Sequence, residues 1–79
     1  MTNLVMTKKD MKKIIHEKLQ GKGIKIHELA KHLSIDASLM SRILANKRKP
    51  SEVQIKKLSE ALDLPYSELL TYYLLSFVM

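Results

Sequence analysis

The side chains of this sequence that could carry chemistry are three histidines, a few serines and many cations. His27 and His32 are five residues apart, about 140° around a helix, so they do not share one face as a metal pair at i and i+4 would. Ser38 and Ser41 have no evident base and carboxylate that would activate a hydroxyl as a nucleophile. Cysteine is absent, and so is a glycine-rich phosphate loop. We therefore predict no catalytic residue, no metal site and no cofactor.

The cations are concentrated in one part of the chain. All fourteen lysines and arginines lie within residues 8–57, where five acidic residues oppose them and leave a net charge of +9. Residues 58–79 contain three acids and no lysine or arginine. A basic body beside an apolar tail favours one surface for a polyanion and another for protein contact. Charge alone leaves the alternative of an ordinary solvated lysine-rich surface open.

The elements that must position these side chains are helices, because apolar residues recur with helical spacing and nothing alternates like a strand. The first helix is expected to begin after Thr7, with Thr7 and Asp10 approximating a capping box. Gly21 and Gly23 bracket its expected end. Residues 1–6 are expected to be a flexible N-terminus.

A second short helix is predicted over residues 27–33, and a third over residues 37–45 with Asp36 as its N-cap. Ser51 and Gln54 form a reciprocal capping box at the start of a fourth helix. Pro65 suits the first turn of a fifth.

The middle of the sequence, residues 25–50, has the pattern of two short helices joined by a tight turn. Ala30 is the small residue where such helices approach most closely, and Ile35 fills the turn. Met40 and Ile43 would anchor the second helix, which leaves its other side outside the core.

This stretch resembles the Cro/C1-type (XRE-like) helix-turn-helix family. The matching residues are Glu28, Leu29, Ala30, Leu33, Ile35, Ser38, Ser41, Ile43 and the run Lys47, Arg48, Lys49, Pro50, followed by Ala61, Leu62 and Ser67, Glu68, Leu69, Leu70. The resemblance covers about residues 7–70 and implies a compact five-helix, all-α domain like that of lambda repressor. It also implies a regulator that binds double-stranded DNA.

The sequence departs from the family pattern at several positions. Lys25 and Ile26 replace the usual Thr-Gln pair, and Leu44 replaces a glutamate. Ser34 and Asn46 stand where the family has glycines, so both must adopt or adjust to a backbone that glycine favours.

By this resemblance the third helix enters the major groove of DNA, with the phosphate contacts around it. The base-reading residues are then Ala37, Ser38, Leu39, Ser41 and Arg42. The phosphate-binding residues are Lys25, His27, Asn46, Lys47, Arg48 and Lys49. Asp36 is interpreted as a helix cap and not as a DNA contact, since a carboxylate facing phosphate repels it.

The fifth helix is more apolar than one face requires, with Tyr72, Leu75 and Met79 outside its main stripe. We expect residues 66–79 to form a symmetric homodimer that binds a palindromic operator. The predicted interface residues are Tyr66, Leu69, Leu70, Tyr73, Leu74, Phe77 and Val78. The alternative is a helix that only covers the monomer core.

A second function remains open: an antitoxin or adaptor that binds a toxin or other protein through its apolar C-terminal helix.

Residues 1–6 are too short for a signal peptide, and residues 69–79 supply about half the ~20 residues of a membrane span. A cytoplasmic protein is therefore expected, and the family resemblance implies a bacterial or phage regulator. The helical pattern runs to Met79 without a stop, which is also consistent with a truncated chain.

Overall fold

The computed structural model describes the backbone of residues 8–77 and the side chains of residues 11–77. Within this part of the chain there are five α-helices and no strand, which confirms the predicted all-α class. The helices are α1 (Lys8–Lys22), α2 (Ile26–His32), α3 (Ala37–Leu44), α4 (Glu52–Leu62) and α5 (Tyr66–Ser76). The expected flexible segment 1–6, the Thr7–Asp10 capping box and Val78 lie outside the described residues or side chains.

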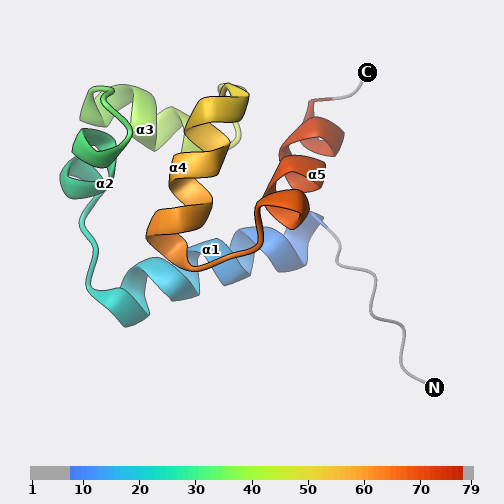
Figure 1. Ribbon diagram of the computed structural model, residues 1–79, viewed down its shortest axis with the longest axis horizontal. Helices are drawn as coiled ribbons and strands as arrows, with labels where there is room; N and C mark the ends of the chain where they lie inside the picture. Colours follow the sequence, from blue (N-terminus) through green and yellow to red (C-terminus); the bar gives the residue numbers. More distant parts are fainter. Residues whose placement is uncertain (1–7, 78–79) are drawn as a thin grey trace.

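The helices form two groups that share one core (Figure 1). In the first group α4 and α5 lie next to each other, and both pack on α1, which runs beneath them in the view. In the second group α2 packs on α3, and α2 also contacts α4. Every helix contributes fully buried side chains, among them Met11, Leu29, Met40, Leu58 and Tyr73. The α2–α3 pair is thereby held at one end of the molecule.

Several helices end in the same way, on a residue with left-handed backbone. Gly23 (φ 65°) ends α1, where its N–H donates to the Gln20 carbonyl and the Ile24 N–H donates to the Leu19 carbonyl. This pair of bonds is the Schellman motif. Gly21 lies inside α1, so only one of the two predicted glycines ends the helix.

The predicted glycine substitutes occupy equivalent positions. Ser34 follows α2 and Asn46 follows α3, each with φ 60°. In both places the next residue donates its N–H five residues back, from Ile35 to Ala30 and from Lys47 to Arg42. Ser34 and Asn46 therefore adopt the left-handed backbone for which the family pattern uses glycine.

Two predicted N-caps, Asp36 and Ser51, are confirmed. The Asp36 carboxylate accepts a hydrogen bond from the Leu39 N–H at 2.7 Å and begins α3. At α4 the Ser51 hydroxyl accepts from the Gln54 N–H, and the Gln54 side chain accepts from the Ser51 N–H. These local bonds stabilise the free N–H groups of each first turn.

The orientation of α5 differs from the prediction. Leu69, Tyr72 and Tyr73 are buried in the chain's own core, whereas Tyr72 was expected outside the main apolar stripe. Leu69 and Tyr73, both predicted at a dimer interface, are 0% exposed and cannot reach a second chain without unpacking the monomer. The cause is that the inward face of α5 is centred on these three residues, which fall at i, i+3 and i+4.

Candidate nucleic-acid interface

Helix α3 presents one face to the core and the other to solvent. Met40, Ile43 and Leu44 are buried, while four of the five predicted base-reading residues are exposed: Ala37, Ser38, Ser41 and Arg42. The fifth, Leu39, is only partly exposed and packs against the core, so its side chain is less available than the sequence suggested. The exposed surface of α3 is thus small, with two hydroxyls and a guanidinium.

Arg42 is the strongest hydrogen-bond donor on this face. Its side chain is exposed, and the ion pair found among residues 11–77 is a different one, between Lys22 and Asp63. The nearest acid in sequence, Asp36, accepts its hydrogen bond from Leu39 at the start of the helix. A guanidinium in this position can form two parallel hydrogen bonds to guanine O6 and N7.

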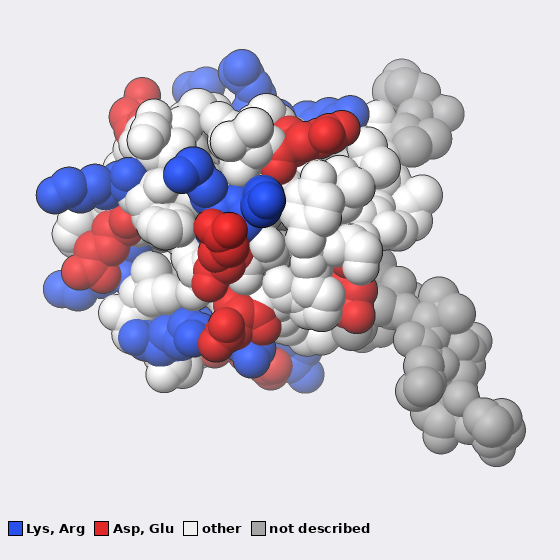
Figure 2. All heavy atoms as spheres, in the orientation of Figure 1, with Lys and Arg blue, Asp and Glu red and all other residues white. Residues whose placement is uncertain are grey.

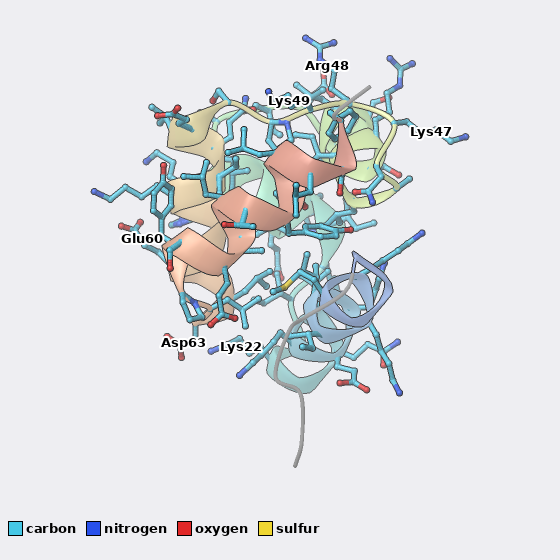
Figure 3. All side chains as sticks on the ribbon, turned by 90° about the vertical axis from the view of Figure 1, so that its right-hand side faces the viewer. Lys22, Lys47, Arg48, Lys49, Glu60 and Asp63 are labelled. Atoms are coloured by element: carbon cyan, nitrogen blue, oxygen red, sulfur yellow. The ribbon has the colours of Figure 1, made fainter. Side chains whose placement is uncertain are left out.

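The loop after α3 carries three consecutive exposed cations, Lys47, Arg48 and Lys49. Figure 3 shows them together at one end of the molecule, away from Glu60 and Asp63. Pro50, which follows them, is buried and fixes the return of the chain into α4. Such a loop can bind phosphates without reading sequence.

Asn46 is placed differently from its predicted role as a phosphate contact. Its side-chain amide donates to the Tyr72 hydroxyl of α5 at 2.8 Å, in a partly buried position. The Asn46 side-chain oxygen is also buried. This hydrogen bond holds the side chain against α5, where Asn46 anchors the basic loop instead of facing outward with the other predicted phosphate contacts.

Tyr72 is the residue that sequence reasoning missed. It supports the loop from 26 positions away in the sequence, and its ring packs edge-on against Tyr73 with centroids 4.8 Å apart. No local pattern pairs an asparagine with a tyrosine at this separation. Only the packing of α5 brings them together.

The two remaining predicted phosphate contacts lie at the start of α2. Lys25 is the N-cap residue and His27 lies in the first turn, and both are exposed. The Glu28 carboxylate accepts from the Lys25 N–H at 3.1 Å, which stabilises the helix start. Glu28 therefore places one negative charge beside these two basic side chains.

The face shown in Figure 2 has a different character. Acidic and basic side chains alternate across it, in front of α4, and the side formed by α5 is largely uncharged. Mixed charge of this kind gives no continuous attraction for a polyanion. The basic loop and the outer side of α3 form the more favourable surface.

The described residues contain no group of three potential metal ligands among histidine, aspartate and glutamate. Tyr73 is the group with a clearly perturbed pKa: burial raises it well above its usual range, and the neighbouring Tyr72 adds to the effect. Its hydroxyl is held neutral inside the core, so it has no access to a substrate.

The arrangement of α2, turn and α3 matches a known family. A family model described as Helix-turn-helix aligns with residues 15–69, more than half of the chain. The chain belongs to the Cro/C1-type helix-turn-helix family. The resemblance expected from the sequence is thereby confirmed, and membership makes this protein a DNA-binding helix-turn-helix regulator.

Neither a curated protein nor a solved structure matched the chain in the other two comparisons. Within residues 8–77, no helix is both long and apolar enough to cross a membrane.

Proposed function

We propose that this helix-turn-helix protein is a sequence-specific transcriptional repressor that reads the major groove of DNA with α3. The observation that carries the proposal is the exposed Arg42 face of α3 directly beside the three cations of the following loop. To read bases, a helix must have an exposed face with directional hydrogen-bond donors that fits the major groove. To position that helix on the DNA, cations must lie next to it and bind phosphates. Both requirements are met within residues 37–49.

The roles divide by chemistry. Arg42 reads a guanine, Ser38 and Ser41 donate to bases or phosphates, and Ala37 contacts a thymine methyl. Leu39 contributes at most its exposed edge to such an apolar contact. Phosphate contacts come from Lys25, His27 and the loop cations Lys47, Arg48 and Lys49.

We propose further that the protein acts as a homodimer on a palindromic site. The apolar side chains that α5 leaves outside the core support this: Leu74 is 43% exposed and Leu75 is 58% exposed. Tyr66 and Leu70 of the same helix and Phe77, which caps its end, are partly buried. In such a dimer the two α3 helices must lie about 34 Å apart, one turn of DNA, to read a palindromic site.

The same exposed leucines support a second candidate, an adaptor or antitoxin that binds another protein through α5. The experiment that separates the two is selection of binding sites from random DNA, followed by affinity measurements across salt concentrations. The repressor predicts a palindrome whose binding weakens steeply with salt, by a slope of about 0.9 per phosphate contact. Weak binding to every DNA sequence would favour the adaptor or antitoxin. A reporter gene placed behind the selected site would test repression.

A further inference from the structure

A groove separates α1 from α3 on the side of the molecule that carries the proposed DNA contacts. Helix α3 packs chiefly on α2, and α1 packs on α4 and α5, so side chains of α1 and α3 leave space between them. The groove has a volume of about 680 Å³. This lies within the range of small-molecule binding sites, roughly 300–1,000 Å³.

The floor of the groove is apolar. Leu19 of α1 and Leu44 of α3 line it, together with Ile24 and Ile26 from the connection and the start of α2. Ile26 is 43% exposed, a large aliphatic side chain left in contact with water. Covering this surface would be favourable by the hydrophobic effect.

The two charged side chains around this floor, Lys12 and Lys25, are both cations. Lys12, His16 and Lys25 line the groove, and no aspartate or glutamate is among its lining residues. Lysine ammonium groups bind carboxylates through charge-assisted hydrogen bonds. The complement of such a groove has an apolar body and one negative group.

We propose that the groove binds a small amphipathic carboxylate, whose apolar chain covers Ile24, Ile26 and Leu44 while its carboxylate is held by Lys12 or Lys25. A DNA phosphate satisfies the lysines but has no apolar body of this kind to cover Ile26. The ligand class is therefore defined by the apolar floor as well as by the lysines around it.

Occupancy of the groove has a consequence that rests on the proposed function. Ser41 of α3 and Ala45, the residue that caps the end of α3, line the groove, and Lys25 does too. Ser41 and Lys25 are among the proposed DNA contacts, so the carboxylate and the operator compete for the same side of α3. The bound ligand lowers DNA affinity, and by linkage DNA lowers the affinity for the ligand.

The first test uses decanoate and the full chain without DNA. Titration followed by NMR should give a dissociation constant on the order of 1 mM, with the largest shifts at Ile24, Ile26 and Leu44. Butyrate lacks the apolar body and decanol lacks the charge, so both should bind at least about tenfold more weakly. Equal binding of all three compounds, or no saturation by about 10 mM decanoate, would overturn the proposal.

Two matched pairs of variants locate the site. Ile26→Asp and Val53→Asp each place an acid on an exposed aliphatic position in the first turn of a helix, but only Ile26 lines the groove. Lys12→Ala and Lys13→Ala each remove an exposed lysine of α1, and only Lys12 lines the groove. Ile26→Asp and Lys12→Ala should weaken decanoate binding several-fold while their partners leave it unchanged. The reverse, or the same effect within a pair, would place the ligand elsewhere.

The second test adds the selected operator. Saturating decanoate should weaken operator binding by wild type and by Val53→Asp, but should leave binding by Ile26→Asp unchanged. If decanoate binds and the operator affinity does not change, competition is refuted while the groove remains a binding site. If the protein binds no operator at all, the proposed function fails, and the titration without DNA still decides the ligand class.

Discussion

Four residues with left-handed backbone follow α1 to α4, and one of them is a glycine. Gly23, Ser34, Asn46 and Asp63 have φ between 57° and 65°. A side chain with a Cβ costs about 1–2 kcal/mol in this conformation, and asparagine and aspartate tolerate it best. Ser34, in the turn between α2 and α3, is therefore the most strained of the three substitutes.

Ser34→Gly should raise the free energy of unfolding by about 0.5–1 kcal/mol, since relief of the strain exceeds the added freedom of the unfolded chain. Urea denaturation measures this change. Asp63→Gly is the matched control with a smaller expected gain, because aspartate is better adapted to the left-handed region and its ion pair with Lys22 is solvent-exposed. A loss of stability in Ser34→Gly would contradict the assignment of strain to the turn.

Tyr73 carries a hydroxyl that is buried without a hydrogen-bond partner among the described residues. Tyr73→Phe removes this unsatisfied group and should raise the free energy of unfolding by about 1 kcal/mol at neutral pH. Because burial raises the pKa of Tyr73, the folded protein keeps the proton at pH values where the unfolded chain loses it. The free energy of unfolding of wild type is therefore unaffected by ionisation of Tyr73 below about pH 10, the usual pKa of tyrosine. It falls as the pH rises above that value.

The difference between Tyr73→Phe and wild type should therefore widen above about pH 10, because only wild type loses stability by ionisation of residue 73 when it unfolds. Denaturation curves of both proteins on either side of this pH provide the measurement. A constant difference would show that the hydroxyl is solvated in the folded protein.

At Arg42, removal of one side chain separates reading of bases from binding of phosphates. Arg42→Ala should cost about 1–3 kcal/mol on the preferred operator and should relax discrimination at one base pair. Arg48→Ala should instead weaken binding to all sequences alike and reduce the salt slope by about one. Competition binding on a panel of operator variants gives both quantities, and unchanged discrimination by Arg42→Ala would remove it from the reading face.

At the scale of the elements, the bond between Asn46 and Tyr72 joins the basic loop to α5. The 2.8 Å hydrogen bond fixes Asn46, the second residue after α3, and the three cations follow immediately. The position of the phosphate-binding loop therefore depends on a helix that takes no part in the proposed DNA contact. We infer that Tyr72 is a positioning residue for the loop.

A double-mutant cycle tests this inference. Tyr72→Phe should lower the free energy of unfolding by about 1 kcal/mol, because it leaves a partly buried amide without its acceptor. Asn46→Gly keeps the left-handed backbone but removes the same bond, so the combined variant should lose less than the sum of the two single losses. Amide exchange at residues 47–49 should accelerate in each variant, and Tyr66→Phe on the same helix provides the control. Additive losses with unchanged exchange would show that the two side chains act independently.

At the scale of the whole molecule, the chain separates a charged end from an apolar side. The exposed cations of the α3–α4 loop lie at one end, and Leu74 and Leu75 are exposed on α5. A dimer through α5 would leave both loops free for DNA. The burial of Leu69 and Tyr73 restricts such an interface to the side chains that the monomer leaves exposed.

Leu74→Asp and Leu75→Asp should shift the protein toward monomer and weaken operator binding, while the fold is retained because both side chains lie outside the core. Sedimentation equilibrium measures the association, and circular dichroism verifies the fold. Val53→Asp, on an exposed aliphatic residue of α4, should leave association unchanged. Wild type that remains monomeric at tens of micromolar would refute the homodimer.

The sequence by itself determined the helices, their caps and the helix-turn-helix motif. Asp36, Ser51 and the substitutes Ser34 and Asn46 were predictable because caps and helix ends depend on bonds between residues three to five positions apart. The outward direction of Arg42 followed in the same way from the spacing of Met40 and Ile43.

Only the tertiary structure decided how α5 is turned, which side chain holds the basic loop, and where α1 and α3 leave a groove. A helix with apolar side chains on several sides has no single stripe that selects its inner face, so burial of Tyr72 depended on the shape of the surrounding core. The contact of Tyr72 with Asn46 and the groove beside Ile26 join residues far apart in sequence, and such contacts exist only after the helices have packed.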